Sequence, residues 1–494
     1  MLSRGNYWQE NLCLEQNPGP CVFVIFGASG DLAGRKLFPS LFALFKRGLL
    51  GDDTRIIGCS RHPHGDESFR AALAGALPGR DAAKKTEFLK RIGYQVLEYG
   101  EEAGYDALKQ RLDSGVLAAL PHLFYLATPA TLYPDITRHL HQAGLLREKS
   151  PKEWRHVVFE KPFGFDAVSA EKLDETLHRY LGESQIYRID HYLGKETVQN
   201  ILLLRFANLI FEPIWNRNYI DNIQITVSET LGVENRAGYF DQAGLLRDMF
   251  QNHMLEMLSL VAMECPAAFT ADAVRDEKLK LIRSIRPFDL KRSPGSVIRG
   301  QYQGYCGEPG IAAGSTTETF VAMKLEVANY RWAGVPFYLR AGKKLDERKS
   351  EIVVVFKSIP HSIFAPLRAK DFQRDILRLR VQPHEGMALT LQAKQAGPKL
   401  CMGALTLNYD YGDAGDEALD AYARLLLDCR LGDQTLFIRS DIIAAAWNLF
   451  GSILDFWRET PGASPLNAYP TGSSGPAAAD ELLRKDGKEW IESR

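Results

Sequence analysis

The chain has 494 residues, and its 60 Lys and Arg against 61 Asp and Glu leave a formal net charge of −1. At roughly 100–200 residues per domain, this length predicts two or more domains. The balanced charge gives no support for a nucleic-acid or membrane-surface partner, because either would need a basic excess or a basic run. No stretch approaches the roughly 18 consecutive apolar residues of a membrane span. The seven cysteines are scattered, as is typical of reduced thiols, so we expect a cytoplasmic protein.

Continuous apolar runs recur along the first part of the chain. They lie at residues 21–26, 56–59, 94–97, 123–127, 156–159 and 186–189. Segments with a helical pattern separate them, the first at residues 32–47. Buried strands that alternate with helices indicate βαβ units and a parallel sheet covered on both faces. We therefore predict an α/β, Rossmann-type coenzyme domain over residues 1–200.

The pattern changes in the second part of the chain. Apolar and polar residues alternate with period two at 221–229, 320–327, 377–381 and 387–391, and a helical block covers 243–263. Such alternation is typical of an antiparallel sheet with one wet face. The segment 466–476 is rich in Pro, Gly and Ser, which predicts a loop. We predict a larger α+β domain built on a mostly antiparallel sheet over residues 201–494.

A glycine-rich turn follows the first predicted strand directly. Its spacing, G-x-x-G-x-x-A from Gly27 to Ala33, is a variant of the dinucleotide fingerprint. Gly27 would allow the tight turn, and Gly30 would let the backbone approach a pyrophosphate at the helix start. Many strand-to-helix turns need glycine for geometry alone, but the strand before and the helix after favour nucleotide binding.

The end of the second predicted strand, residues 54–59, indicates which dinucleotide binds. An NAD site usually carries Asp or Glu there, whereas this strand ends in Ser60-Arg61-His62, and Asp52 and Asp53 precede it. Arg61 is therefore placed for a 2′-phosphate, which favours NADP. A solvated surface arginine is the alternative.

Lys161 follows the predicted strand 156–159. Ligands of open parallel sheets bind beyond the carboxyl ends of the strands, so Lys161 would point into the cleft. Pro162 could form a cis peptide that fixes the direction of Lys161, and residues 125–129 would line the cofactor side. An ordinary strand-end lysine is the alternative.

The next predicted strand ends in a dense polar segment, Arg188 to Glu196. His191, Tyr192 and Lys195 would give two cations and a hydroxyl near a helix start, which suits a phosphate dianion. A solvated capping turn is the alternative.

His253 lies in the helical block, with Met249 and Met257 on the same stripe. It is either a buried structural histidine or a general base, for which an imidazole suits neutral pH. A base would need an orienting carboxylate, and Asp190 and Asp248 are both candidates. In an α-helix Asp248 would lie roughly 140° away from His253, so their side chains would not stack.

Together these motifs resemble the glucose-6-phosphate dehydrogenase family. The segments that carry the resemblance are 27–37, 160–164, 188–196, 238–241, 247–253, 335–349 and 432–437, in the family's order over nearly the whole chain. The resemblance implies oxidation of glucose 6-phosphate at C1 to 6-phosphoglucono-1,5-lactone with hydride transfer to NADP, the first step of the oxidative pentose phosphate pathway. NAD could be accepted more weakly, and no metal is implied.

The resemblance also assigns roles to individual residues. It implies His253 as the proton acceptor and Asp190 as the carboxylate that orients it. It implies substrate contacts from Lys161, His191, Tyr192, Lys195, Glu229, Asp248, Lys343, Arg348 and Gln382. We expect the cofactor to be bound by Gly27, Ala28, Ser29, Gly30, Asp31, Leu32, Arg61, Ala127, Pro129 and Lys161.

Two other functions compete with this one. A different NAD(P)-dependent sugar dehydrogenase would share the glycine turn but lack the cluster at 191–195. A catalytically silent NADP-binding sensor would have lost His253 or Asp190, and both are present. The resemblance further implies a homodimer or homotetramer, while nothing in the sequence fixes the oligomeric state or any regulation.

Overall fold

The structure, a computed structural model, describes residues 17–148, 150–364, 367–368, 371–398, 401–411, 419–460 and 462–492. Backbone contacts divide the chain into two compact units. The first comprises the described parts of Met1–Phe163, Lys172–His191 and Leu419–Ile438. The second comprises those of Gly164–Glu171, Tyr192–Ala418 and Arg439–Arg494. The contacts therefore place the late segment Leu419–Ile438 in the first unit. A single domain boundary at residue 200 would assign this segment to the second unit.

The first unit is built on a six-stranded parallel sheet with the order β3-β2-β1-β4-β5-β6. Its strands are β1 (Val22–Phe26), β2 (Arg55–Ser60), β3 (Ile92–Val96), β4 (His122–Leu126), β5 (Arg155–Phe159) and β6 (Ile186–Arg188). Because β1, β4 and β5 are buried along their whole length, they read as continuous apolar runs. The predicted Rossmann-type fold is confirmed.

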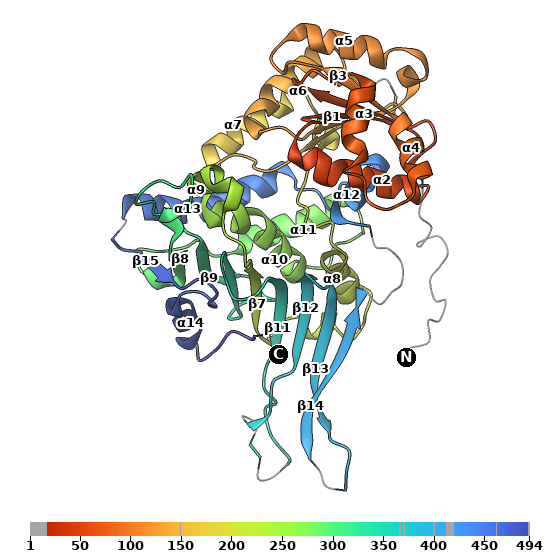
Figure 1. The fold of residues 1–494 in the computed structure, drawn as a ribbon. Coiled ribbons are helices and arrows are strands. Elements are labelled where there is room, and N and C mark those ends of the chain that lie inside the picture. Colours follow the sequence, from red (N-terminus) through yellow and green to blue (C-terminus); the bar gives the residue numbers. More distant parts are fainter. Residues whose placement is uncertain are drawn as a thin grey trace. The chain divides into compact units, whose positions relative to one another are not determined.

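Helices cover both faces of this sheet. They are α2 (Phe38–Lys46), α3 (Asp66–Ala74), α4 (Ala82–Lys90), α5 (Glu102–Leu112), α6 (Tyr133–Gln142), most of α7 (Ala167–His178) and α12 (Ala421–Leu431). Figure 1 shows α2, α3 and α4 on one side of the sheet and α5 and α6 on the other. Edge-to-face and tilted ring contacts, such as Phe38 with Phe69, join α2 to α3 and α4.

Helix α12 comes from far along the sequence, yet it is bonded into the first unit. Asp420, its N-cap, accepts a hydrogen bond of 2.8 Å from Ser40 on α2. The carbonyl oxygen of Cys429 lies 2.7 Å from Nδ1 of His156 on β5. Burial lowers the pKa of His156 to about 4, so this imidazole stays neutral and serves as a structural contact.

The second unit is built on a nine-stranded sheet with the order β14-β13-β12-β11-β7-β10-β9-β8-β15. Its strands are β7 (Ile220–Ser228), β8 (Val297–Tyr302), β9 (Phe320–Glu326), β10 (Pro336–Gly342), β11 (Lys349–Phe356), β12 (Ile376–Gln382), β13 (Gly386–Lys394), β14 (Met402–Asp410) and β15 (Leu466–Tyr469). Only the pairs β7–β10 and β8–β15 are parallel among these strands. The predicted mostly antiparallel sheet is confirmed.

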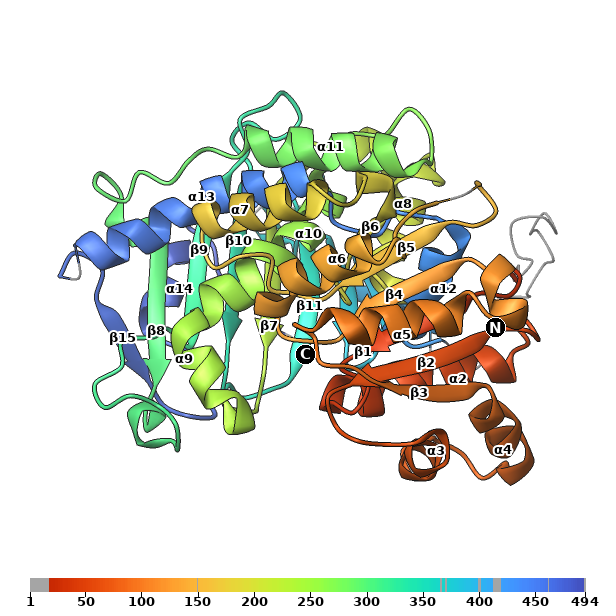
Figure 2. The ribbon, with the colours of Figure 1, turned by 90° about the horizontal axis from the view of Figure 1, so that it is seen from above.

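Helices cover one face of this sheet, and the C-terminal segment contacts the other. The helices of the unit are α8 (Glu196–Phe206), α9 (Ala237–Leu245), the π-helix η7 (Leu246–Met254), α10 (Leu255–Ala262), α11 (Ala271–Ser284), α13 (Ser440–Glu459) and α14 (Ala477–Arg484). Figure 2 shows α10, α11 and α13 stacked beside one another. Trp332 links Phe337 of β10 to the carbonyl of Ala262 on α10, so α10 lies on the apolar face. On the opposite face, Arg340 of β10 and Gln224 of β7 bond to Glu492 and Glu489 of the C-terminal segment.

One local prediction was wrong. The segment 466–476 is not all loop, because Leu466–Tyr469 forms the short parallel strand β15 beside β8. The predicted helical block 243–263 is confirmed from Leu246 to Ala262, although Gly244 has φ 70° and Leu246–Met254 is π-helical. In the part of the chain that the structure describes, no helix is long and apolar enough to cross a bilayer.

Candidate active site

The glycine-rich turn leaves no room for a side chain at its first position. Gly27 has φ +79°, and a Cβ there would lie 2.4 Å from the carbonyl oxygen of Ala127 at the end of β4. The N–H of Gly27 donates to the carbonyl of Cys59, and the N–H of Gly30 donates back to Gly27, both over 2.9 Å. This turn leads into a helical stretch that includes the π-helix η1 (Ala33–Leu37). The tight turn, without a side chain at Gly27 and followed by a helix start, has the form that a pyrophosphate of a dinucleotide requires.

Polar side chains gather where β2 ends. The hydroxyl of Ser29 lies 2.7 Å from the hydroxyl of Ser60 and 2.9 Å from Nδ1 of His62. Arg61 stands between Ser60 and His62 in the chain and is exposed. The sequence predicted Ser29 and Arg61 but not His62, whose contact with Ser29 depends on the fold. This group lies where a Rossmann-type fold receives the adenosine ribose.

Lys161 stands at the end of β5, beside a buried carboxylate. The Lys161–Pro162 peptide is cis, as predicted. The preceding Glu160 accepts a hydrogen bond of 2.5 Å from the hydroxyl of Tyr125, and it also bonds the hydroxyl of Tyr422 on α12. Burial raises the pKa of the Glu160 carboxyl, against the opposing effect of these phenols and of Lys161. Tyr422 is a site neighbour that the sequence did not indicate, whereas Tyr125 belongs to the segment 125–129 that was expected to line the cofactor side.

Asp190 and His191 are the last residues of the first unit before the chain enters the second. Arg188, only 1% exposed, anchors the strand that leads to them through ion pairs of 2.7 Å with both Asp174 and Glu183. Asp190 is also 1% exposed. The His191 ring lies parallel to the ring of Tyr422, 6.2 Å away. The predicted cluster 188–196 is therefore divided, with Asp190 and His191 in one unit and Tyr192 and Lys195 in the other.

In the second unit, Tyr192 lies against the predicted base. Its ring stacks on the imidazole of His253 with 4.5 Å between centroids. The Tyr192 hydroxyl lies 3.2 Å from the hydroxyl of Ser350 and accepts a hydrogen bond of 3.1 Å from the amide of Gln382. Gln382 also donates to Ser350 over 2.8 Å. The side chain of Gln382 thus holds the phenol in place.

The helix that carries His253 differs from the expected α-helix. Asp248 and His253, which are 9% and 1% exposed, both lie within the π-helix η7. In a π-helix the hydrogen bonds join residues five apart. Positions 248 and 253 therefore lie more nearly on the same side of the helix than they would in an α-helix. The prediction that their side chains point in clearly different directions was based on α-helical geometry and does not apply here. Asp248 remains a candidate partner of the base.

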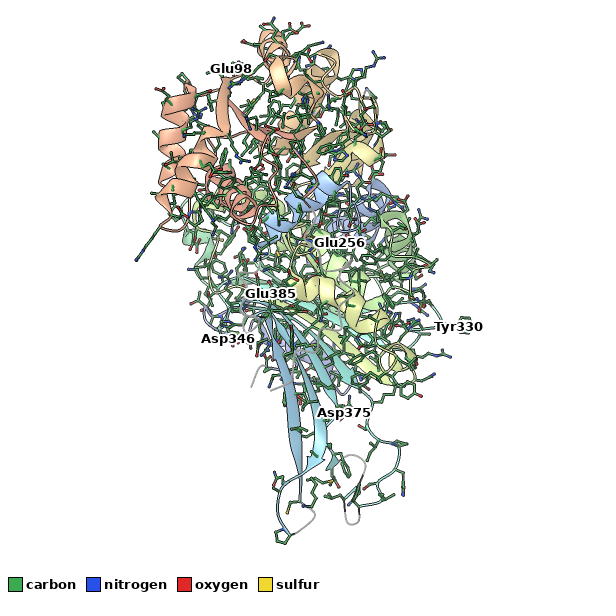
Figure 3. The ribbon with its side chains drawn as sticks, turned by 90° about the vertical axis from the view of Figure 1, so that its right-hand side faces the viewer. Glu98, Glu256, Tyr330, Asp346, Asp375 and Glu385 are labelled. Carbon is green, nitrogen blue, oxygen red and sulfur yellow. The ribbon has the colours of Figure 1, made fainter. Side chains whose placement is uncertain are left out.

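Lys195 stands at the start of α8 as its N-cap residue. Its ammonium lies 3.8 Å from Glu385, which also accepts a hydrogen bond of 2.9 Å from the backbone N–H of Thr197. Figure 3 shows Glu385 at the upper end of the strands β13 and β14. An ammonium group at the positive end of a helix dipole is suited to bind an anion.

Lys343 and Glu229 form an ion pair at the ends of the parallel strands β10 and β7. The N–H of Glu229 donates to the carbonyl of Gly342 over 2.9 Å, which fixes the two strand ends side by side. The Lys343 ammonium also lies 5.0 Å from the ring centroid of Phe240. Arg348 is exposed on the following turn. Lys343 and Glu229 therefore present complementary charges that can bind sugar hydroxyls.

Two family models cover almost the whole chain. The model described as glucose-6-phosphate dehydrogenase, NAD binding domain, matches residues 24–200, and the one described as the C-terminal domain matches residues 202–491. The predicted family resemblance is thereby confirmed.

Relatives of known name agree with these matches. The chain is 42% identical over 487 residues to glucose-6-phosphate 1-dehydrogenase of Aggregatibacter actinomycetemcomitans, covering 95% of this chain and 97% of that protein. It is 39% identical to the Bacillus subtilis enzyme of the same name, covering 95% and 98%. A solved glucose-6-phosphate dehydrogenase in complex with its substrate glucose 6-phosphate superposes with a TM-score of 0.88 at 34% identity, covering 96% and 99%. A Mycobacterium avium structure gives 0.83 at 35%, also covering 96% and 99%.

We predict that Gly27→Ala weakens dinucleotide binding at least tenfold. The left-handed backbone alone costs a non-glycine residue about 1–2 kcal/mol, and the Cβ would meet the Ala127 carbonyl at 2.4 Å. Fluorescence titration with NADPH measures the affinity. Gly34→Ala is the matched control, because a Cβ at Gly34 meets no atom within 4 Å. Equal affinities for the two variants would contradict the assignment of this turn.

Proposed function

Because the chain belongs to the glucose-6-phosphate dehydrogenase family, we propose that it oxidises glucose 6-phosphate at C1 to 6-phosphoglucono-1,5-lactone, with NADP as the acceptor. The observation that supports this most is the stacking of Tyr192, from the predicted phosphate segment, on the buried His253. When bound, the nicotinamide ring accepts the hydride from C1.

His253 would take the proton from the C1 hydroxyl as the hydride leaves. The imidazole is 1% exposed, and its neighbour Tyr192 holds it from one side. We propose that Asp190 binds the other ring nitrogen and so fixes the tautomer. Asp190 is equally buried and precedes Tyr192 by only two residues, which supports this pairing over Asp248.

The remaining polar groups would bind the substrate at its two ends. We propose that His191, Tyr192 and Lys195 bind the 6-phosphate, and that Lys161, Glu229, Asp248 and Lys343 bind the sugar hydroxyls. Gln382 would act through the Tyr192 hydroxyl, to which it donates. Arg348, exposed on the turn after Lys343, would add positive charge near the substrate. Phosphate binding would thus hold C1 in place for the chemical step.

NADP rather than NAD is the proposed acceptor. No acidic side chain stands at the end of β2, which ends at Ser60 and is followed by Arg61 and His62. Ser29 contacts Ser60 and His62, the two neighbours of Arg61 in the chain. Their hydroxyl and imidazole groups, together with the Arg61 guanidinium, suit a phosphate. The turn from Gly27 to Leu32, together with Ala127 and Pro129, would bind the rest of the cofactor.

We predict that the purified chain reduces NADP with glucose 6-phosphate and that His253→Ala lowers kcat by about 10²–10⁴-fold, the usual contribution of a general base. Binding of glucose 6-phosphate, measured by calorimetry, should change little. The assay follows absorbance of the reduced cofactor, and His141→Ala, an exposed histidine on α6, is the control. Absence of turnover by the wild type would refute the function, and equal turnover of free glucose would favour a different sugar dehydrogenase.

We predict that Arg61→Ala lowers the ratio of kcat/KM for NADP to that for NAD by tenfold or more. A hydrogen bond to a charged group contributes about 1.5–3 kcal/mol, and only NADP carries the 2′-phosphate. The exposed Arg80, replaced by Ala, controls for a general loss of positive charge in the same unit. An unaltered ratio would show that other residues select the cofactor.

We also propose that the chain forms a homodimer or homotetramer in the cytoplasm. Strand β14 is an edge of the nine-stranded sheet, and one of its faces exposes Leu405, Leu407 and Tyr409 by 46–54%. An exposed apolar row on an edge strand can pair or pack with another chain. A relative from Arabidopsis thaliana, 40% identical, is described as cytoplasmic.

Leu407→Lys should reduce the oligomer to monomers in analytical ultracentrifugation, because it places a charge in the exposed apolar row. Thr406→Lys, on the opposite side of the same strand, is the matched control. A monomeric wild type at micromolar concentration would contradict the oligomer.

A further inference from the structure

A buried carboxylate that plays no part in the proposed chemistry lies at the start of the helix that carries His253. Glu318, directly before Thr319 and β9, is 5% exposed. Its Oε1 accepts a hydrogen bond of 3.0 Å from the N–H of Leu246, and its backbone oxygen accepts one of 3.1 Å from the N–H of Leu245. These N–H groups belong to the first turn of the helix, where no carbonyl precedes to accept them. One residue therefore caps the helix twice.

The chain before the helix is shaped around this carboxylate. Gly244 has φ 70°, and a Cβ there would lie 2.4 Å from Oε1 of Glu318. The carboxylate can approach the first turn only because that position has no side chain. The close approach fixes where the π-helix η7 begins, and with it the positions of Asp248 and His253.

The residue after Glu318 is bonded to the other half of the sugar site. The carbonyl of Thr319 accepts a hydrogen bond of 3.0 Å from the N–H of Lys343. The hydroxyl of Tyr469 donates to the carbonyls of Lys343, over 2.7 Å, and of Thr319, over 3.2 Å. The adjacent residues Glu318 and Thr319 thus hold the start of the helix that carries His253 and the backbone of Lys343, directly after β10.

The bond from the N–H of Leu246 needs an acceptor oxygen on residue 318 but does not need a negative charge there. Burial raises the pKa of its carboxyl, and the N–H of Leu246, Arg247 and Arg299 only oppose that rise. The bond from Leu246 uses a side-chain oxygen as acceptor, and a neutral side chain of the same length would keep it. The bond from Leu245 goes to the backbone oxygen and does not depend on the side chain.

We propose that Glu318 is a positioning residue for the oxidation, which sets the location of His253 relative to Lys343 through its acceptor bond to Leu246. The proposal rests on the proposed function. A displaced base costs much of its effect even when every catalytic group is present, because effective catalysis requires near-attack geometry.

Three variants test it. Glu318→Ala should lower kcat/KM for glucose 6-phosphate at least tenfold, while the KM for NADP stays within twofold because the cofactor turn belongs to the first unit. Glu318→Gln keeps the acceptor and should recover kcat/KM to within threefold of the wild type. Asp81→Ala is the matched control, because Asp81 caps α4 through a similar carboxylate bond of 2.9 Å to the N–H of Lys84, and it should leave both constants unchanged.

Each outcome decides the proposal. Full activity of a folded Glu318→Ala, or equal losses in the Ala and Gln variants, would overturn it. If Glu318→Ala does not fold, the comparison moves to Glu318→Asp, whose shorter side chain withdraws the acceptor. Gln more active than Asp supports the proposal, and the reverse order overturns it. An inactive wild type would instead refute the proposed function, so the two failures are distinguishable.

Discussion

The contact between the rings of Tyr192 and His253 is the interaction through which, in the proposed function, phosphate binding would be connected to removal of the proton. Tyr192 is held at its hydroxyl by Ser350 and Gln382, from two strands of the nine-stranded sheet, so its ring is a fixed surface against the imidazole. In the proposed function, Tyr192 would meet both the substrate phosphate and the base, which would make the two events geometrically dependent. The bond from the N–H of Leu246 to Glu318 holds the first turn of the helix that carries His253, the other partner in this contact.

Sequence patterns were most informative where burial differs between neighbouring positions or is uniform over a short run. The strands β1, β4 and β5 are wholly buried and short, and β12 alternates, so both types could be predicted. The central strands β10 and β11 are buried on both faces but carry Arg340, Lys349 and Glu351 in that buried state. Arg340 and Lys349 pair with Glu492 of the C-terminal segment, and Glu351 pairs with Arg378 of β12, and no local pattern can show these partners.

Some residues of the candidate site could likewise be predicted from the sequence, and others could not. Residues at strand ends, such as Lys161 and Asp190, follow from the rule that ligands bind beyond the carboxyl ends of parallel strands. The neighbours Tyr422 and Glu318 do not follow, because their partners lie far away in the sequence or on the backbone. The π-helical turn around His253 was not predicted either, because helix periodicity assumes 3.6 residues per turn. Single π-turns occur locally, often at functional sites, and leave no periodic pattern. Family resemblance supplied residue roles that spacing alone left open.

The return of helix α12 to the first unit has a consequence for how the protein is made. Ser40 and His156 find their partners Asp420 and Cys429 only after most of the chain has been synthesised. Until then, the coenzyme unit emerging from the ribosome lacks one of its helices, and apolar surface on α2, against which α12 packs, stays uncovered. The Rossmann-type unit of this enzyme is therefore no self-contained module that could be exchanged by cutting near residue 200. Its completion waits for the chain that follows, so the two units mature together.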